Sequence, residues 1–285
     1  MPQDAVSADI TVEQTDTEYG CWTHACWRPP HLAGYVERLW YSEGTTAAPR
    51  ERLLPNGLVE LAICLAEPHR LIEGAGPALL RACLTGLQTG PMVIEHPSYH
   101  RVLGLRLHPA GAYAALALSM REVSGLTVEL CDLVGRAGDE LAERCHDAPS
   151  IERCFHVAAD WVAERAARSR GLDPRIAWTV GRIDESGGRV PIAELREATG
   201  YSKTRLADAF REQIGVVPKV YARIVRYRRA LALLDARTSS LADVALQAGY
   251  YDQSHMTTEF RELGGLTPRE FVAVHYPGST TAIEY

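Results

Sequence analysis

The chain has 285 residues, of which 46% are hydrophobic, and a formal net charge of −6; its length predicts about two globular domains with sizeable cores. Residues 175–275 hold 15 Lys and Arg against 12 Asp and Glu, so the C-terminal third is mildly basic and the remainder acidic, an asymmetry that favours a nucleic-acid contact at that end. No apolar stretch reaches 18 residues, which excludes a transmembrane helix.

Residues 1–16 are polar and acidic and lack the basic start and apolar core of a secretory signal. We therefore expect a flexible N-terminus at 1–18. The seven cysteines are scattered, which is typical of reduced thiols rather than a disulfide framework. Together these features predict a cytoplasmic protein.

Residues 19–112 contain short apolar runs separated by Gly and Pro, such as 58–65, 91–95 and 101–107. Runs of this length predict β-strands. Because side chains alternate between the faces of a strand, Arg106 shares one face of its run with Val102, Gly104 and His108, and leucines occupy the other. A β-rich domain, either a small barrel or a sandwich, is expected here.

Residues 113–171 are predicted to form a helical linker or dimerisation region, with helices near 111–119, 132–145 and 150–169. In the last of these, four residues at helical spacing form an apolar face: Ile151, Phe155, Ala158 and Val162. Ser150 is positioned to cap this helix.

Residues 173–276 are predicted to be an all-α domain, followed by a tail at 277–285. Pro174 at a first helical position and the Thr267/Glu270 capping-box spacing mark two helix starts. The seven expected helices are 174–186, 192–199, 203–213, 218–234, 241–247, 253–263 and 268–275.

This helical region contains a near-repeat. Residues 198–210 and 248–260 each carry a Gly-Tyr turn, a polar capping residue and a helix that includes Phe, and each is followed by a Gly-x-x-Pro sequence. Two copies of helix, Gly-containing turn and helix predict two helix-turn-helix units, a motif that places its second helix in a DNA major groove.

Polar side chains remain outward at the start of both second helices, where base-edge and phosphate contacts are made. Between the two units, a helix of about 17 residues spans roughly 25 Å and could hold two recognition helices near one DNA turn apart, about 34 Å. Its basic side chains either contact DNA or form a solvated face: Lys219, Arg223, Arg226, Arg228 and Arg229.

The stretch 240–271 closely resembles the AraC/XylS family of bacterial transcription regulators. The resemblance rests on Asp243-Val244-Ala245, Gly249-Tyr250, Asp252-Gln253-Ser254-His255, Phe260-Arg261, Gly265-Leu266-Thr267-Pro268 and Phe271. The first unit matches as well through Gly215-Val216-Val217-Pro218, Tyr221, Val225-Arg226 and Arg229-Ala230. The resemblance covers about 100 residues and implies a seven-helix DNA-binding domain with two helix-turn-helix units.

Ten residues are expected to bind DNA from the outward faces and the family positions together: Lys203, Thr204, Arg205, Ala207, Asp208, Gln253, Ser254, His255, Thr257 and Thr258. Asp208 and Thr258 depart from the long basic or amide side chains that family members often have there. Asp208 could accept from a cytosine amino group, but an ion pair with Arg205 or Arg211 is the favoured interpretation. Base specificity then rests on the second unit or on Arg205.

The N-terminal region resembles the cupin-like sensory domain of one AraC/XylS branch, through 54–61, 84–91 and 104–112. A small barrel can enclose one modest ligand. The effector-pocket candidates are Trp40, Tyr99, Arg106 and His108, with Trp22, Trp27, Tyr41 and His100 as further aromatic or polar candidates. For the aromatic residues, a core position is the alternative; for Arg106 and His108, a strand-end salt bridge is.

The fold class is thus α+β: a cupin-like β-rich domain, a helical linker and an all-α domain with two helix-turn-helix units. The predicted function is sequence-specific transcription regulation that responds to an effector. The alternatives are an architectural DNA-binding protein without an effector and an enzyme fused to a DNA-binding domain, although no catalytic motif is found. Neither a cofactor nor a metal site is expected. Candidate partners are double-stranded DNA, RNA polymerase, a small-molecule effector and a second copy of the chain, with no membrane.

Overall fold

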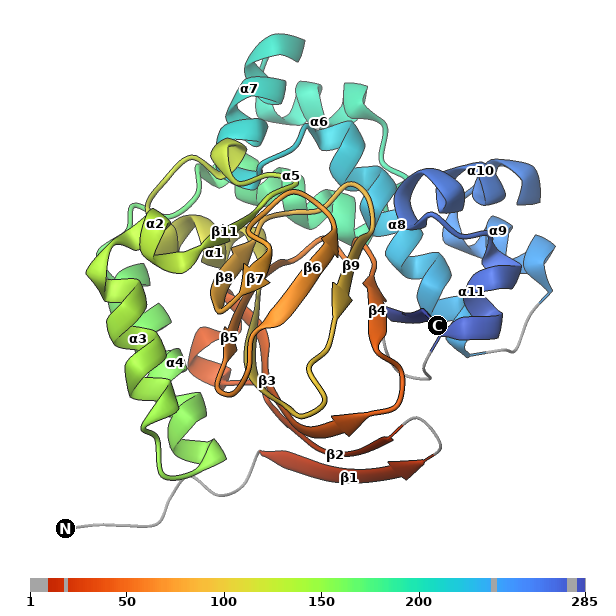
Figure 1. Ribbon diagram of the computed structural model, residues 1–285. Coiled ribbons are helices and arrows are strands. Elements are labelled where there is room, and N and C mark those ends of the chain that lie inside the picture. The colour runs from red at the N-terminus through yellow and green to blue at the C-terminus, as the bar shows by residue number, and fades with distance from the viewer. Residues whose placement is uncertain (1–9, 18–19, 237–239, 276–280, 285) are drawn as a thin grey trace.

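The computed structural model describes residues 10–17, 20–236, 240–275 and 281–284. The strands lie in one β-rich region and the C-terminal helices in another, with a helical linker beside the strands (Figure 1). The expected α+β architecture is therefore observed. Within the described ranges, no helix combines the length and apolar character needed to cross a membrane.

The strands form two antiparallel sheets. The first, of seven strands, has the order β1-β2-β3-β10-β5-β8-β11, and the second, of five, has the order β12-β4-β9-β6-β7. The first comprises β1 (Thr11–Thr17), β2 (Gly20–Trp27), β3 (Val36–Thr46), β5 (Val59–Cys64), β8 (Ala82–Thr85), β10 (His100–Leu107) and β11 (Thr127–Glu129). The second comprises β4 (Arg50–Leu53), β6 (His69–Glu73), β7 (Leu79–Leu80), β9 (Met92–Glu95) and β12 (Thr281–Glu284).

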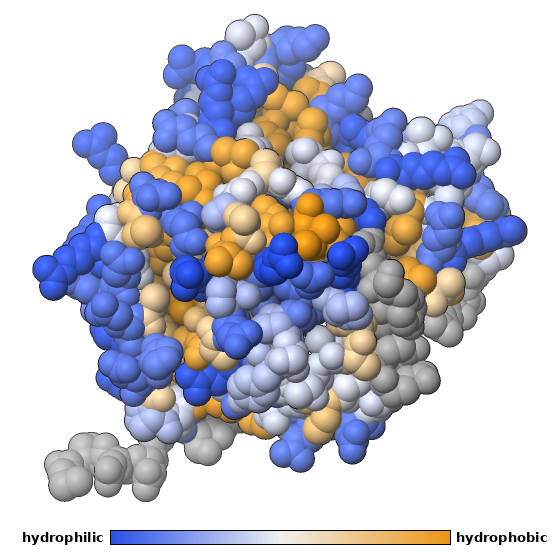
Figure 2. Space-filling view, in the orientation of Figure 1, coloured by the Kyte–Doolittle hydropathy of each residue, from blue (hydrophilic) through white to orange (hydrophobic). Residues whose placement is uncertain are grey.

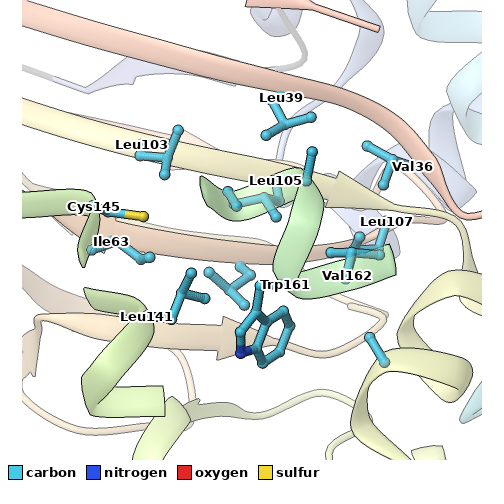
Figure 3. Close-up of a cluster of buried hydrophobic side chains, with 14 of the residues drawn as sticks. Val36, Leu39, Ile63, Leu103, Leu105, Leu107, Leu141, Cys145, Trp161 and Val162 are labelled. Atoms are coloured by element: carbon cyan, nitrogen blue, oxygen red, sulfur yellow. The ribbon is translucent and has the colours of Figure 1, made fainter. Parts of the chain in front are cut away.

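The central strand β10 separates an apolar core from an internal cavity, as its alternation predicts. Leu103, Leu105 and Leu107 are fully buried against the linker helices (Figure 3). His100, Val102 and Arg106 line the opposite, cavity-facing side. Figure 3 shows the core side with Trp161 and Val162 of the linker facing the leucines.

The linker consists of four helices: α1 (Pro109–Leu116), α2 (Leu130–Val134), α3 (Arg136–His146) and α4 (Ile151–Ala166). The single helix expected at 132–145 is two, because Gly135 adopts φ +62° between α2 and α3. In α4 the expected inward residues Phe155, Ala158 and Val162 are fully buried. Ser150 caps α4 by accepting a hydrogen bond from the Arg153 amide.

The seven predicted C-terminal helices are all present, each within one residue of its expected ends: α5 (Pro174–Glu185), α6 (Ile192–Thr199), α7 (Lys203–Ile214), α8 (Pro218–Asp235), α9 (Leu241–Ala248), α10 (Gln253–Gly264) and α11 (Pro268–Val274). The predicted Thr267/Glu270 capping box is formed. Local capping chemistry therefore fixes most of these boundaries.

The two regions pack on each other. Leu54 and Leu87 of the β-rich region belong to the same buried cluster as the C-terminal helices. Arg228 of α8 donates to the Asn56 carbonyl at 3.2 Å, and Ser119, preceding the 3-10 helix η2 (Met120–Glu122), donates to Glu212 of α7 at 2.8 Å. In the space-filling view, apolar side chains gather across the middle of the molecule, where strands and helices meet, and hydrophilic ones dominate the periphery (Figure 2).

Both predicted terminal segments differ from expectation. Residues 11–17, expected within a flexible N-terminus at 1–18, form β1 and pair with β2, while residues 1–9 and 18 lie outside the described residues. Of the tail at 277–285, residues 281–284 form β12 and pair with β4, and the rest lies outside the described residues. The C-terminal strand thus adds to a sheet of the N-terminal region. The β-rich domain also extends past residue 112, since β11 lies at 127–129.

Candidate nucleic-acid interface and internal cavity

The two helix-turn-helix units have the same local construction. The first helix ends on a glycine in the left-handed region, Gly200 at φ +69° or Gly249 at φ +96°. A buried tyrosine follows, Tyr201 or Tyr250. The second helix is then capped by Ser202 or Asp252, whose side chain accepts from the backbone amide three residues on. The near-repeat in the sequence is therefore a repeat in structure.

The first unit presents a charged surface on α7. Lys203, Thr204 and Arg205 are exposed, and Ala207 is half-buried. Asp208 accepts from Arg211 at 3.1 Å, which is the ion pair favoured from the sequence. The Asp208 carboxylate thus has an intramolecular partner, as expected for a residue that does not read a base.

The second unit presents mainly uncharged polar side chains on α10. Gln253 and Ser254 are exposed. The Thr257 and Thr258 hydroxyls donate to the carbonyls of Gln253 and Ser254, at 2.8 and 3.1 Å. These back-bonds orient the two hydroxyl groups and leave their oxygen lone pairs as acceptors.

His255 is exposed but built into the turn. Its Nδ1 accepts from the Tyr251 amide at 3.4 Å, and its ring packs edge-on against Tyr250. The His255 Nε2 atom lies 3.8 Å from Glu259. These contacts give His255 a structural part at the turn in addition to its predicted place at the DNA surface.

The arginines of α8 hold the domain together. Arg223 and Arg226 both pair with Glu259 of α10, at 2.7 and 3.3 Å, and Arg223 also pairs with Glu262. Arg228 pairs with Asp184 of α5 at 3.4 Å. The basic face predicted for this helix is therefore largely neutralised within the fold, because three of its five cations have carboxylate partners.

A cavity of about 810 Å³ lies between the two sheets of the β-rich region. This volume is in the range of small-molecule sites. Residues of both sheets line it, including Trp22, His24, Arg38, Trp40, Ser42, Glu51, Glu60, Cys64, His69, Met92, His96, His100 and Arg106.

One end of the cavity carries charged and aromatic groups. Glu60 accepts from the Trp40 indole at 2.7 Å and from Arg106 at 3.5 Å. The Trp40 ring lies over Gly104, where an added Cβ would come within 2.0 Å of it, so the glycine makes room for the indole. Burial and the nearby Arg38 lower the pKa of His24, which keeps that ring neutral.

The other end carries three histidines, His69, His96 and His100, with ring centroids 4.8 to 6.4 Å apart. His96 contacts Glu51 at 3.2 Å, and His100 contacts the Ser42 hydroxyl at 2.8 Å. Burial and the neighbouring histidines lower the pKa of His69 to about 3 and lower that of His100. This end is polar, and His69 and His100 are uncharged at neutral pH.

The predicted pocket residues separate into three groups. Trp40 and Arg106 line the cavity, as do Trp22 and His100. Tyr99 instead lies on the surface and donates to Glu43, because β10 begins only at the next residue. His108 lies just beyond the end of β10 and precedes α1, where its amide donates to the Tyr35 carbonyl. Trp27 and Tyr41 belong to the apolar core, the alternative considered for the aromatic residues.

Comparison with protein families locates the helical repeat within a known group. Residues 195–273 match the model of a helix-turn-helix domain family. Over 124 residues the chain is 27% identical to a putative AraC-like transcription regulator of Streptomyces lividans, covering 42% of this chain and 38% of the relative. The chain carries a helix-turn-helix domain of the AraC/XylS family. The resemblance to this family that the sequence motifs carry is thus confirmed.

Two other relatives match over shorter stretches. The chain is 39% identical over 67 residues to the uncharacterised regulator YbfI of Bacillus subtilis, covering 24% of each chain. It is 32% identical over 73 residues to the F1 operon positive regulatory protein of Yersinia pestis, covering 26% of this chain and 24% of the relative. The chain therefore matches about a quarter of the length of these two relatives.

Among solved structures, ToxT from Vibrio cholerae aligns with 82% of this chain and 98% of its own, at 11% identity and a TM-score of 0.46. The C-terminal domain of AraT from Geobacillus stearothermophilus aligns with 37% of this chain and 88% of its own, at 20% identity and a TM-score of 0.35. Residues 28–129 match a domain family of unknown function, DUF6597.

His69 and His96 of the cavity wall are not among the candidates predicted from the sequence. Both stand outside the clear apolar runs, so no periodicity marked their direction, and only the pairing of β6 with β9 places them near His100. No three His, Cys, Asp or Glu side chains in the described residues are arranged to hold a metal ion. The seven cysteines are free thiols.

Proposed function

We propose that this protein is a sequence-specific, DNA-binding transcription regulator that responds to a small-molecule effector, and not an enzyme. In this proposal α7 and α10 enter two adjacent segments of the major groove. The observation that carries it is the repeated helix-turn-helix construction, with polar side chains exposed on the first turn of both second helices. The regulator names of its relatives support the same assignment.

The connecting helix supports simultaneous reading of two groove segments. Helix α8 has 18 residues and is tied to α10 through Glu259 and to α5 through Asp184. Such ties would fix the separation of the two recognition helices, so a single chain could engage both segments. RNA polymerase contact, homodimer formation and a cytoplasmic location stay predictions.

The effector part of the proposal rests on a wall shared by the cavity and the DNA-binding domain. Leu54 lines the cavity and also belongs to the buried cluster of the C-terminal helices. Asn56, two residues later, lines the cavity, and its carbonyl accepts from Arg228 of α8. A ligand that shifts this loop would therefore act directly on the helix between the two DNA-reading units. The presence of this cavity favours an effector-responsive regulator over an architectural protein without an effector.

Sequencing of DNA fragments retained by the purified protein from a random pool tests the DNA-binding part. We expect enrichment of one shared sequence with two blocks about one helical turn apart. Recovery of fragments that share no sequence would contradict the proposal.

Thermal unfolding in the presence of pooled small metabolites tests the effector part. We expect a fraction that raises the melting temperature of the wild type but not of Ala62→Phe, which fills the cavity. Ala177→Phe, at an exposed position of α5, is the matched control and should respond like the wild type. The same shift in all three proteins would place the ligand elsewhere.

A further inference from the structure

The junction between the linker and α5 gathers arginines around one tyrosine ring. Arg170, Arg175 and Arg205 line an open surface pocket of about 640 Å³ together with Tyr201 and Asp173. The Arg175 guanidinium carbon lies 4.9 Å from the Tyr201 ring centroid, and that of Arg205 lies 5.0 Å from it. One aromatic ring therefore positions two guanidinium groups from different helices.

Tyr201 is itself fixed by hydrogen bonding. Its hydroxyl donates to Asp173 Oδ2 at 2.8 Å, and Asp173 Oδ1 accepts from the Arg175 amide at 2.8 Å. Tyr201 is also almost fully buried. The ring cannot reorient without breaking the hydrogen bond from its hydroxyl to Asp173, the N-cap residue of α5. The two guanidinium groups therefore stack on a ring whose position is already fixed.

These cations differ from five arginines of the domain that form ion pairs. Arg182, Arg211, Arg223, Arg226 and Arg228 each have a carboxylate partner within 4.0 Å. Among the described residues, no such ion pair is formed by Arg170, Arg175 or Arg205. The single carboxylate in the pocket, Asp173, is used by the helix cap and by Tyr201. Three positive charges thus converge on one pocket that holds a single carboxylate.

We propose that Arg170, Arg175 and Arg205 form a phosphate clamp that binds the DNA backbone at the edge of the site read by α7. Guanidinium groups bind phosphate oxygens through paired N–H donors, which makes arginine suited to this role. The clamp rests on the proposed DNA-binding function and deepens it. It also assigns Arg205 to positioning the protein on the backbone, while sequence is read by other side chains.

Fluorescence anisotropy with a selected DNA fragment and a scrambled fragment of the same composition tests the clamp. We expect Arg175→Ala and Arg205→Ala each to weaken binding to both fragments by the same factor, about tenfold, as for loss of a charge-assisted hydrogen bond. The double variant should lower the slope of log affinity against log salt by about 0.9 for each phosphate that it no longer neutralises.

Matched variants separate the clamp from general charge and folding effects. Arg144→Ala removes the same charge from an exposed position of α3 that does not line the pocket. This variant should bind DNA like the wild type, within about twofold. Tyr201→Phe keeps the ring and should retain most of the affinity, while Tyr201→Leu, confirmed as folded by circular dichroism, should lose as much as Arg205→Ala.

The outcomes are distinguishable. Loss of affinity for the selected fragment alone would make Arg205 a base reader and overturn the clamp, as would variants that behave like Arg144→Ala. A third outcome would also overturn the clamp: inorganic phosphate stabilises the wild type but not the double variant, and the double variant binds DNA with unchanged affinity. The pocket would then bind a free anion. If the wild type enriches no DNA sequence, the proposed function itself fails.

Discussion

The two helix-turn-helix units share one backbone plan but differ in how they use charge. In the first, Lys203 and Arg205 are exposed on α7, and Arg205 stacks on Tyr201. In the second, α10 begins with Gln253 and Ser254, and its Glu259 receives two arginines of α8. The first unit thus offers positive charge to a partner, whereas the second uses positive charge to hold itself together.

This difference separates two tasks that DNA-binding proteins combine. Cations without a carboxylate partner suit the phosphate backbone, which carries no direct sequence information. Amide and hydroxyl groups suit base edges, where each donor and acceptor has a defined partner. The repeat therefore favours backbone contact mainly in the first unit and base reading mainly in the second.

The largest expected effect comes from removing the carboxylate that holds the second unit. Glu259→Gln leaves Arg223 and Arg226 without their shared partner at a buried position, and we expect a loss of about 3 kcal/mol in the free energy of unfolding. Urea denaturation measures it. Glu262→Gln is the control. This more exposed carboxylate pairs with one arginine of the described residues, Arg223, and its replacement should cost under about 1 kcal/mol. Equal losses would contradict a structural role specific to Glu259.

A somewhat smaller effect is expected at the wall between the cavity and the DNA-binding domain. Leu54→Ala should lower the free energy of unfolding by about 2 kcal/mol, because Leu54 is buried between the two regions. It should also weaken any effect of a cavity ligand on DNA affinity. Leu246→Ala, at a 62% exposed leucine of α9, should change stability by less than about 0.5 kcal/mol. If a cavity ligand changed the DNA affinity of Leu54→Ala as much as that of the wild type, the ligand would not act on DNA binding through Leu54.

Base discrimination should depend on the second unit. Gln253→Ala is expected to reduce the preference for the selected sequence over single-base variants by about 1.5 kcal/mol, roughly tenfold, at the contacted base pair. Competition binding with the variant sequences measures it. Asp208→Ala in the first unit should leave the preference unchanged, because Asp208 is paired with Arg211. If Asp208→Ala lost more sequence preference than Gln253→Ala, base reading would lie mainly in the first unit, contrary to this account.

The neutral histidines of the cavity predict the smallest effect, a pH-dependent one. The pKa of His69 is about 3 in the folded protein and near 6.5 when unfolded, so below pH 6.5 the unfolded chain takes up a proton that the folded protein does not. Stability should therefore fall by about 1 kcal/mol between pH 6.5 and 5.5 from this group alone. His69→Asn should flatten the dependence in urea denaturation, while His146→Asn, at an exposed site, should not. A curve unchanged by His69→Asn would contradict a neutral, buried His69.

The helical domain was predictable from the sequence because its boundaries depend on local chemistry. Ser202, Ser240 and Asp252 cap helices through contacts three residues away, so short-range pattern is enough. Asp208 was expected to pair with Arg205 or Arg211, both three residues away on the same helix, and it pairs with Arg211. In the β-rich region, alternation placed Arg106 on the face opposite the leucines, which is the cavity side. It could not show where a strand begins or ends, which decides the positions of Tyr99 and His108.

Long-range pairing lay beyond the sequence patterns. The pairing of β12 with β4 joins residues more than 220 positions apart, and no periodicity in the sequence predicts it. The ion pairs of Arg223 and Arg226 with Glu259 likewise depend on α10 lying against α8. From the sequence alone, a helix face that forms such ion pairs cannot be distinguished from one that binds DNA. Tyr201 was recognised as a turn residue, but its two stacked arginines come from α5 and α7 together.

The most direct test of the unequal repeat is to repeat the selection of bound DNA with Gln253→Ala and with Arg205→Ala and compare the enriched sequences base by base. We predict that Gln253→Ala loses information in one block of the bipartite sequence, while Arg205→Ala enriches the same sequence as the wild type with lower yield. A changed sequence for Arg205→Ala, with the wild-type sequence kept by Gln253→Ala, would contradict the account.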